Sequence, residues 1–281
     1  MTELESMALS IWTENLPRWA ALSEWLPVNP WPFVLLGVAV GMMVGLTSIG
    51  AGAIATPVLI LFLDVPPIGA VGSAIVAGAA MKAVGIWRHQ QRGTVDRKLV
   101  GYLLTGSVPG VLVAVLIVSF LRSQDFSLAN VWVDRVLGFT LLVLGLCVLA
   151  RNTEWVRRWQ AGMDQPNVAR RGLMIGALVG LLFGTTSIGT GSLLVLLLTI
   201  FLALPEVRVV GSAILFGFVI SLFAGVIHVV LGNVIWGLVM LLLAGALPGV
   251  MLGSELAARA PHRLLRTAFS VGAVLAGLKL I

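Results

Sequence analysis

Long apolar runs separated by short polar connections make up most of the chain. The first run extends from about Trp31 to Leu63, and three more end at about Trp87, Leu121 and Ala150. About 20 consecutive apolar residues are needed for a helix to cross the hydrocarbon layer of a membrane. The pattern therefore predicts an all-α membrane protein.

The second half of the chain repeats the first. At a constant offset of 139 residues, 28 of the 71 positions from 41 to 111 are identical to their partners without a gap. The matches include Pro66/Pro205 and the block Val71–Ile75, which returns as Val210–Ile214, whereas chance similarity between apolar sequences would fall mostly at Leu and Val. We predict two homologous repeats, residues 33–150 and 172–281, each with a broken or re-entrant first helix and three spanning helices.

Both repeats carry the same interruption in their first apolar run. The motif TSIGAG at residues 47–52 divides the first run near its middle, and TSIGTG occupies residues 186–191. Glycines weaken a helix, and the backbone groups that they free are costly in hydrocarbon unless they line a polar cavity or are buried in protein. Close helix packing by small residues is the alternative explanation. We expect the breaks to bind substrate through Thr47, Ser48, Gly50, Gly52, Thr186, Ser187, Gly189 and Gly191.

Two topologies fit the runs. If all runs cross fully, there are eight spans, and Lys and Arg divide 11 inside to 6 outside. If the broken runs are re-entrant hairpins, there are six spans with an inverted second repeat, and the division is 13 to 4. Because basic residues favour cytoplasmic connections, we expect the inverted arrangement. Each half of a broken run, at about 12–16 residues, is also expected to be too short to cross alone.

Two segments are expected outside the repeats. Residues 1–30 predict an interfacial helix, since Trp12, Leu16 and Trp19 recur at helical spacing, and four glutamates argue against a cleavable signal. Residues 151–171 predict a basic connecting loop between transmembrane repeats at 31–150 and 172–281. Asp134 and Arg135 open the run 131–150 and are expected at its solvated end.

Composition agrees with a membrane protein and limits the function classes. Hydrophobic residues make up 59% of the chain, charged residues 11%, and the mean hydropathy is +1.05. The net charge of +6 comes from basic residues in the connections, which favours a topology signal over nucleic-acid binding. Three His and one Cys without ligand spacing predict no metal or other cofactor, and no catalytic triad or carboxylate pair lies within the runs, so we expect no enzyme.

Further polar residues inside the runs are candidates for the site. Lys82 is the basic residue well inside a predicted span, so it is expected to neutralise an anion, with snorkelling to the interface as the alternative. Ser73 and Ser212 open the helices that follow the breaks and are added as substrate-binding candidates, although Ser73 and Lys82 face opposite sides of an ideal helix. The matched pair His89 and His228 is a candidate for proton coupling, with interfacial histidines that bind backbone or lipid as the favoured alternative.

A family resemblance rests on these motifs. They are GLTSIGAGAIATPVLI at Gly45–Ile60, AVGSA at Ala70–Ala74, the basic G-x-V-D turn at Gly93–Asp96, and Pro109-Gly110. From about residue 33 to 280 the chain resembles the TauE/SafE sulfite exporter family, also called the sulfonate uptake permease family. The resemblance implies transport of sulfite, thiosulfate, sulfonates or sulfoacetate. Ala51 and Thr190 stand where the family tends to have the middle of three glycines, which affects the identity of the substrate more than the fold.

The functional expectation combines the repeat, the breaks and this resemblance. It is a secondary transporter of small sulfur-containing anions that alternates access around a midplane site formed by the two breaks. The alternative is an anion channel in which the same breaks act as a selectivity filter. The expected partners are a small anionic solute and membrane lipid, and protons are a candidate coupling ion. The expected location is the bacterial inner membrane, as a multi-pass protein. The anion, the direction of transport, the coupling ion, the oligomeric state and the choice between eight spans and six spans with two hairpins stay open.

Overall fold

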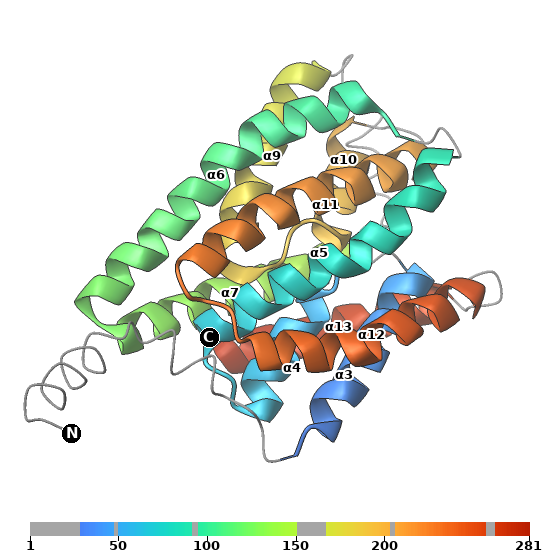
Figure 1. The fold of residues 1–281 in the computed structure, drawn as a ribbon. Helices are drawn as coiled ribbons and strands as arrows, with labels where there is room; N and C mark the ends of the chain where they lie inside the picture. The colour runs from blue at the N-terminus through green and yellow to red at the C-terminus, as the bar shows by residue number, and fades with distance from the viewer. Residues whose placement is uncertain (1–28, 48–49, 92–94, 151–166, 203–205, 257–261) are drawn as a thin grey trace, which may run out of the picture.

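The computed structural model describes residues 29–47, 50–91, 95–150, 167–202, 206–256 and 262–281. These ranges contain ten helices and no strand (Figure 1). The helices of the first half are α3 (Trp31–Thr47), α4 (Gly52–Leu63), α5 (Pro67–Gln91), α6 (Arg97–Gln124) and α7 (Phe126–Ala150). Those of the second half are α9 (Val168–Thr186), α10 (Ser192–Leu202), α11 (Glu206–Val230), α12 (Trp236–Leu256) and α13 (His262–Leu280). The predicted interfacial segment and most of the predicted basic loop lie outside the described residues.

Helix length and composition confirm a multi-pass membrane protein. Among the described residues, α6, α7, α9, α11 and α12 each have at least 18 residues and are apolar enough to cross a membrane. Large apolar side chains such as Leu116, Phe120 and Phe139 are exposed on the outer surface, where lipid would cover them. The all-α prediction is therefore correct.

Both first runs are interrupted at the motifs that predicted a break. α3 ends at Thr47 and α4 begins at Gly52, while α9 ends at Thr186 and α10 begins at Ser192. The expected length of about 12–16 residues for each half is wrong for the first halves, because α3 has 17 residues and α9 has 19. α9 begins within the predicted basic loop, where the Asn167 side chain accepts a hydrogen bond from the Arg170 amide and caps the helix.

α9 and α10 form a hairpin. The Arg171 guanidinium, near the start of α9, donates a hydrogen bond of 2.8 Å to the carbonyl of Phe201, near the end of α10. A cation at a helix C-terminus also interacts favourably with the helix dipole. The chain therefore enters through α9 and returns through α10 to the same end, although α9 alone is long enough to count as a span.

Close helix pairs join the two halves. A Cβ added to Gly180 of α9 would lie 2.3 Å from the carbonyl oxygen of Ser107 in α6, and one added to Gly41 of α3 would lie 2.3 Å from that of Ala246 in α12. The residue numbers of the contacts rise together along α9 and α6, since Gly176, Gly180 and Gly184 lie against Leu103, Ser107 and Val111 in that order. α9 therefore runs parallel to α6, and the same spacing makes α3 parallel to α12 (Figure 1).

Two other pairs run antiparallel. In α5 and α11, Gly72 lies against Asn233 at the end that follows α11, whereas Gly217 lies against Lys82 ten residues later in α5. In α7 and α13, Gly138 packs against Gly277 near the C-terminus of α13, whereas Gly145, later in α7, packs against Ser270, earlier in α13. The members of each antiparallel pair are related by the sequence offset of 139 residues.

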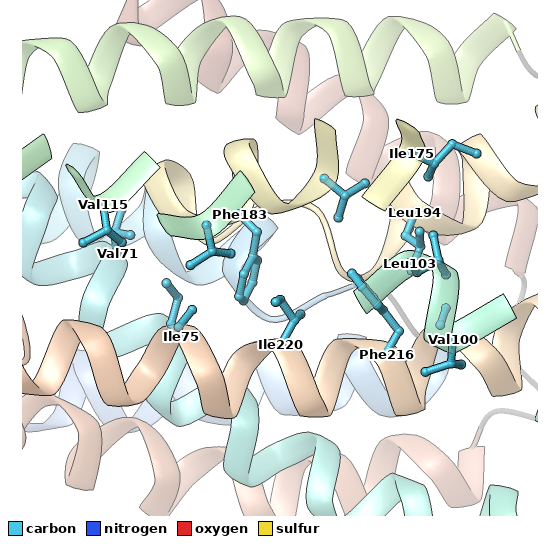
Figure 2. Close-up of a cluster of buried hydrophobic side chains, with 14 of the residues drawn as sticks. Val71, Ile75, Val100, Leu103, Val115, Ile175, Phe183, Leu194, Phe216 and Ile220 are labelled. Carbon is cyan, nitrogen blue, oxygen red and sulfur yellow. The ribbon is translucent and has the colours of Figure 1, made fainter. Parts of the chain in front are cut away.

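The apolar core also combines both halves. Its largest cluster is formed by side chains from α5, α6, α7, α9, α10 and α11, with Phe183 and Phe216 fully buried (Figure 2). A second cluster combines α3, α4 and α5 with α12. The packing therefore makes the two halves one unit.

Asp134 is not at a solvated helix end. α7 begins at Phe126, eight residues earlier, because Asp125 binds the Ser127 amide at the start of the helix. Oδ1 of Asp134 is buried and has no hydrogen-bond partner among the described residues. The expectation of a solvated end is therefore wrong.

The helix contact at Gly180 generates a stability prediction. Gly180→Ala places a methyl group against the Ser107 backbone, so we expect the free energy of unfolding to fall by about 1–3 kcal/mol. Thermal unfolding of the purified protein in detergent measures this. Gly101→Ala is the matched control, because nothing lies within 4 Å of its Cβ position. Equal stability of the two variants would contradict the close packing of α6 and α9.

Candidate functional site

The two breaks lie against each other. A Cβ added to Gly50 would lie 3.3 Å from the Cα of Gly191, and one added to Gly52 would lie 2.3 Å from the carbonyl oxygen of Ser187. The Oγ1 of Thr56 and the Oγ of Ser187 share a buried hydrogen bond of 2.6 Å. Segments 139 residues apart in the sequence therefore meet at one point in the fold.

The second break has an unusual backbone. Ser187 has a φ of 60° and donates its amide to the carbonyl of Phe183, which ends α9. The Ile188 amide donates to Oγ1 of Thr186 at 3.2 Å. Gly189 has a φ of 150°, a conformation that residues with a Cβ rarely adopt. The glycine is therefore needed for the turn between α9 and α10.

Unpaired amides collect at both breaks. The amides of Leu194 and Val195 donate to carbonyls of Gly189 and Gly191, but those of residues 189–193 have no hydrogen-bond acceptor among the described residues. The same holds for the amides of residues 50–52, before α4. The first amides of a helix lack partners within the helix, and the helix dipole places partial positive charge there. Such groups can bind an anion.

The Lys82 ammonium lies beside the second break. Its Nζ donates hydrogen bonds to Oγ1 of Thr190 at 2.9 Å and to Oγ of Ser221 at 2.8 Å. It also lies 5.5 Å from the centroid of the Phe183 ring, within the range of a cation–π contact. In the described part of the chain, no carboxylate pairs with this ammonium. Two hydroxyls therefore hold the side-chain nitrogen of Lys82 beside the second break.

Several predicted site residues meet here, and others are not described. Gly50, Gly52, Ser187, Gly189 and Gly191 all belong to the contact between the breaks. Thr186 donates its hydroxyl to the Leu182 carbonyl and shapes the end of α9. Thr47 ends α3, but its side chain and all of Ser48 lie outside the described residues.

Ser73 and Ser212 contact turns in the opposite half. Oγ of Ser73 accepts a hydrogen bond from the Ile235 amide, before α12, and Oγ of Ser212 accepts one from the Asp96 amide, before α6, both at 2.9 Å. Each serine lies nine residues before Lys82 or Ser221, a distance of about 13.5 Å along a helix axis. The fold therefore does not bring these two serines to the ammonium.

The two histidines differ in how far they are described. His228 is buried, and its Nε2 lies 3.1 Å from the carbonyl oxygen of Gly184 in the last turn of α9. His89 belongs to α5, but its side chain lies outside the described residues. A proton-coupling role for these residues stays a prediction.

Four residues of the site were missed in the sequence. Thr190 stands between the two glycines of the second break, and Ser221 is the repeat partner of Lys82. The sequence could have indicated both residues, because a hydroxyl at a helix break, or at the repeat partner of a lysine, can hydrogen-bond to the lysine side chain. Thr56 and Phe183 are ordinary residues of apolar runs, and only the fold shows that they contact the site.

Comparison with known proteins identifies the family. Residues 33–280 match the family described as sulfite exporter TauE/SafE, and this range covers all ten described helices except the first two residues of α3. The chain belongs to the TauE/SafE family. It is therefore a membrane transporter, which is not an enzyme class.

Relatives of this TauE/SafE protein occur in Bacillus subtilis (strain 168). Probable membrane transporter protein YjnA is 32% identical over 252 residues, which cover 88% of this chain and 98% of the relative. Probable membrane transporter protein YdhB is 22% identical over 248 residues, with the same shares covered. No solved structure matches the chain significantly.

The contact between Gly52 and Ser187 generates a functional prediction. Gly52→Ala pushes the breaks apart at an overpacking cost of about 1–3 kcal/mol, so we expect transport to fall by roughly 10-fold to 100-fold. Uptake of labelled sulfite into proteoliposomes measures the loss. Gly272→Ala, whose Cβ position is open, is the control. Wild-type uptake by a folded Gly52→Ala protein would show that the close contact is not needed.

Proposed function

We propose that this TauE/SafE protein is a secondary transporter of small sulfur-containing anions such as sulfite, thiosulfate, sulfonates or sulfoacetate. One observation carries the proposal. The Lys82 ammonium lies where the two breaks meet, and its partners are the hydroxyls of Thr190 and Ser221 rather than a carboxylate. An anion would complete the charge balance of the site.

Electrostatics supports an anionic ligand. A charge inside a membrane protein is costly unless it is paired, and such residues usually serve function. Attraction between Lys82 and an anion at 4 Å is about 4 kcal/mol at an effective dielectric constant of 20. The unpaired amides at residues 50–52 and 189–193 add donors that suit an oxyanion or sulfonate.

We further propose that residues 31–150 and 172–281 are inverted repeats. Equivalent helices pack antiparallel in the pairs α5/α11 and α7/α13, as a two-fold axis in the membrane plane requires. Lys82 and Ser221, which are 139 residues apart, hydrogen-bond each other. Repeat partners in direct contact lie beside the axis that relates the repeats, so the ammonium lies near the membrane midplane.

The mechanism follows from this arrangement. The described contact leaves little room between the breaks, because a Cβ added to Gly50 would already lie 3.3 Å from the Cα of Gly191. Binding requires the hydroxyls to release the ammonium to the anion and the breaks to separate. Rocking of one half against the other would then expose the anion to each side in turn, as in other transporters with inverted repeats. Protons are the proposed coupling ion.

A channel that uses the same breaks as a filter makes a different prediction. A carrier saturates and accumulates anion against its gradient when a proton gradient is imposed. A channel only lets the anion run down its electrochemical gradient. Sulfite flux into proteoliposomes with and without a pH gradient separates the two.

The pairing of Lys82 with Ser221 gives a sharp test of the site. Lys82→Ser removes the ammonium, and the loss of a charged hydrogen bond predicts a KM for sulfite about 10-fold to 100-fold higher. The double variant Lys82→Ser/Ser221→Lys supplies the ammonium from α11 to the same central position, so we expect most of the affinity to return. Saturation kinetics in proteoliposomes give both values.

The single and double variants control for each other. Ser221→Lys alone places two ammonium groups together and is expected to fold poorly or to transport slowly. An unchanged KM in Lys82→Ser would remove Lys82 from the site. A double variant as weak as Lys82→Ser would argue against the repeat axis passing beside these residues, while leaving the anion site in place.

A further inference from the structure

A chain of hydrogen bonds connects the end of α6 with the last turn of α9. The Arg122 guanidinium donates to Oδ1 of Asn233 and, at 3.1 Å, to the carbonyl of Leu231. Nδ2 of Asn233 lies 3.3 Å from Nδ1 of His228, and Nε2 of His228 lies 3.1 Å from the Gly184 carbonyl oxygen. Asn233 and His228 are each 2% exposed, so the middle of this chain is inside the protein.

The groups at the two ends of this hydrogen-bond chain determine which atoms within it donate and which accept. Arg122 can only donate, so the oxygen of the Asn233 amide faces it and the NH₂ group faces His228. Nδ1 of His228 then accepts, and the Nε2–H donates to the Gly184 carbonyl. The chain therefore holds a neutral imidazole in one tautomer with both ring nitrogens bound.

A local turn places Asn233 in this chain. At the end of α11 the Gly232 amide donates to the Val229 carbonyl and the Asn233 amide to the His228 carbonyl, which is the Schellman pattern. Gly232 has a φ of 66°, so a glycine is favoured there. The turn brings the Asn233 side chain back against the His228 ring.

The Gly184 carbonyl needs a donor because α9 stops. In a continuous helix this carbonyl would accept from the Ile188 amide, but that amide donates to Thr186 instead. His228 supplies the missing donor to Gly184, which lies two residues before the TSIG motif. The imidazole therefore holds the end of the half-helix from which the second break leaves.

The repeat partner of His228 is also a histidine, but the repeat partners of the other side chains in the hydrogen-bond chain differ. Gly45 and His89 are the repeat partners of Gly184 and His228, but Thr94 replaces Asn233 and Pro261 replaces Arg122. Neither replacement offers the same donors. The sequence of the first half therefore does not repeat the Arg–Asn–His set.

We propose that His228 is a positioning residue for the anion site, and that Asn233 and Arg122 fix its tautomer. The chain anchors the end of α9, and with it the amides at residues 189–193, to the α11–α12 turn. The link with transport rests on the proposed function, whereas the anchoring of the second break does not. A proton-transfer role for His228 predicts a different result, because only that role requires the imidazole ring to gain and lose a proton.

Two substitutions at residue 228 separate these roles. Gln offers an N–H donor and an oxygen acceptor in place of the two ring nitrogens but does not titrate, and Leu offers neither. Hydrogen exchange of the segment 184–193 in detergent reports the anchoring without any transport. Sulfite uptake into proteoliposomes, with and without a pH gradient, reports function. His89→Leu is the matched control.

We expect His228→Leu to speed exchange in segment 184–193 by about tenfold and to raise the KM by a similar factor, since the buried hydrogen bond to the Gly184 carbonyl is lost. His228→Gln should keep exchange, KM and the response to a pH gradient close to wild type, and His89→Leu should leave exchange in this segment unchanged. If His228→Leu does not fold, Asn233→Leu is expected to speed exchange there in the same direction.

Wild-type exchange in both His228→Leu and Asn233→Leu would overturn the proposal. So would a His228→Gln protein that keeps wild-type exchange but no longer responds to a pH gradient, because this marks a proton carrier. If the wild-type protein moves no sulfur anion, the proposed function fails, and the exchange data still decide whether His228 anchors the break.

Discussion

The structure depends on a constraint that lipid imposes on the backbone. Where α3 and α9 stop inside the protein, amides and carbonyls lose their helical partners, and hydrocarbon cannot replace them. Protein groups satisfy several of them: Thr186 binds the Ile188 amide, and His228 binds the Gly184 carbonyl. The breaks also shield each other, because their glycines allow backbone contact. The amides left over at residues 50–52 and 189–193 are the donors that we propose for the anion.

Glycine contacts hold the helices together, and one lysine side chain provides the proposed contact with the anion. The parallel pairs α3/α12 and α6/α9 cross between the halves with backbones in close contact, so each half supports the broken helix of the other. Lys82 then places its side-chain nitrogen beside the second break, within hydrogen-bonding distance of Thr190. Ser73 and Ser212 help to hold the two halves together, since each accepts a hydrogen bond from the backbone of a turn in the opposite half.

Much of this could be predicted from the sequence, because membrane helices and repeats leave strong patterns. The apolar runs gave the helices, and the TSIG motifs gave both breaks at the correct residues. The position of Lys82 inside a span marked it as unusual. Contacts between distant segments could not be derived, since no local pattern states that Thr190 and Ser221 hold the Lys82 ammonium. Asp134 was misplaced because α7 begins at Phe126, five residues before the predicted run, and includes the polar residues Ser127 and Asn130.

The central claim is that the two breaks and Lys82 hold a small oxyanion. Diffraction from crystals grown with selenite tests it directly, because anomalous scattering locates the selenium atom of this sulfite analogue. The account predicts one selenium site within hydrogen-bonding reach of the Lys82 ammonium and of amides from residues 50–52 or 189–193. An ordered selenium site elsewhere in the protein, or an empty meeting point of the breaks at saturating selenite, would contradict it.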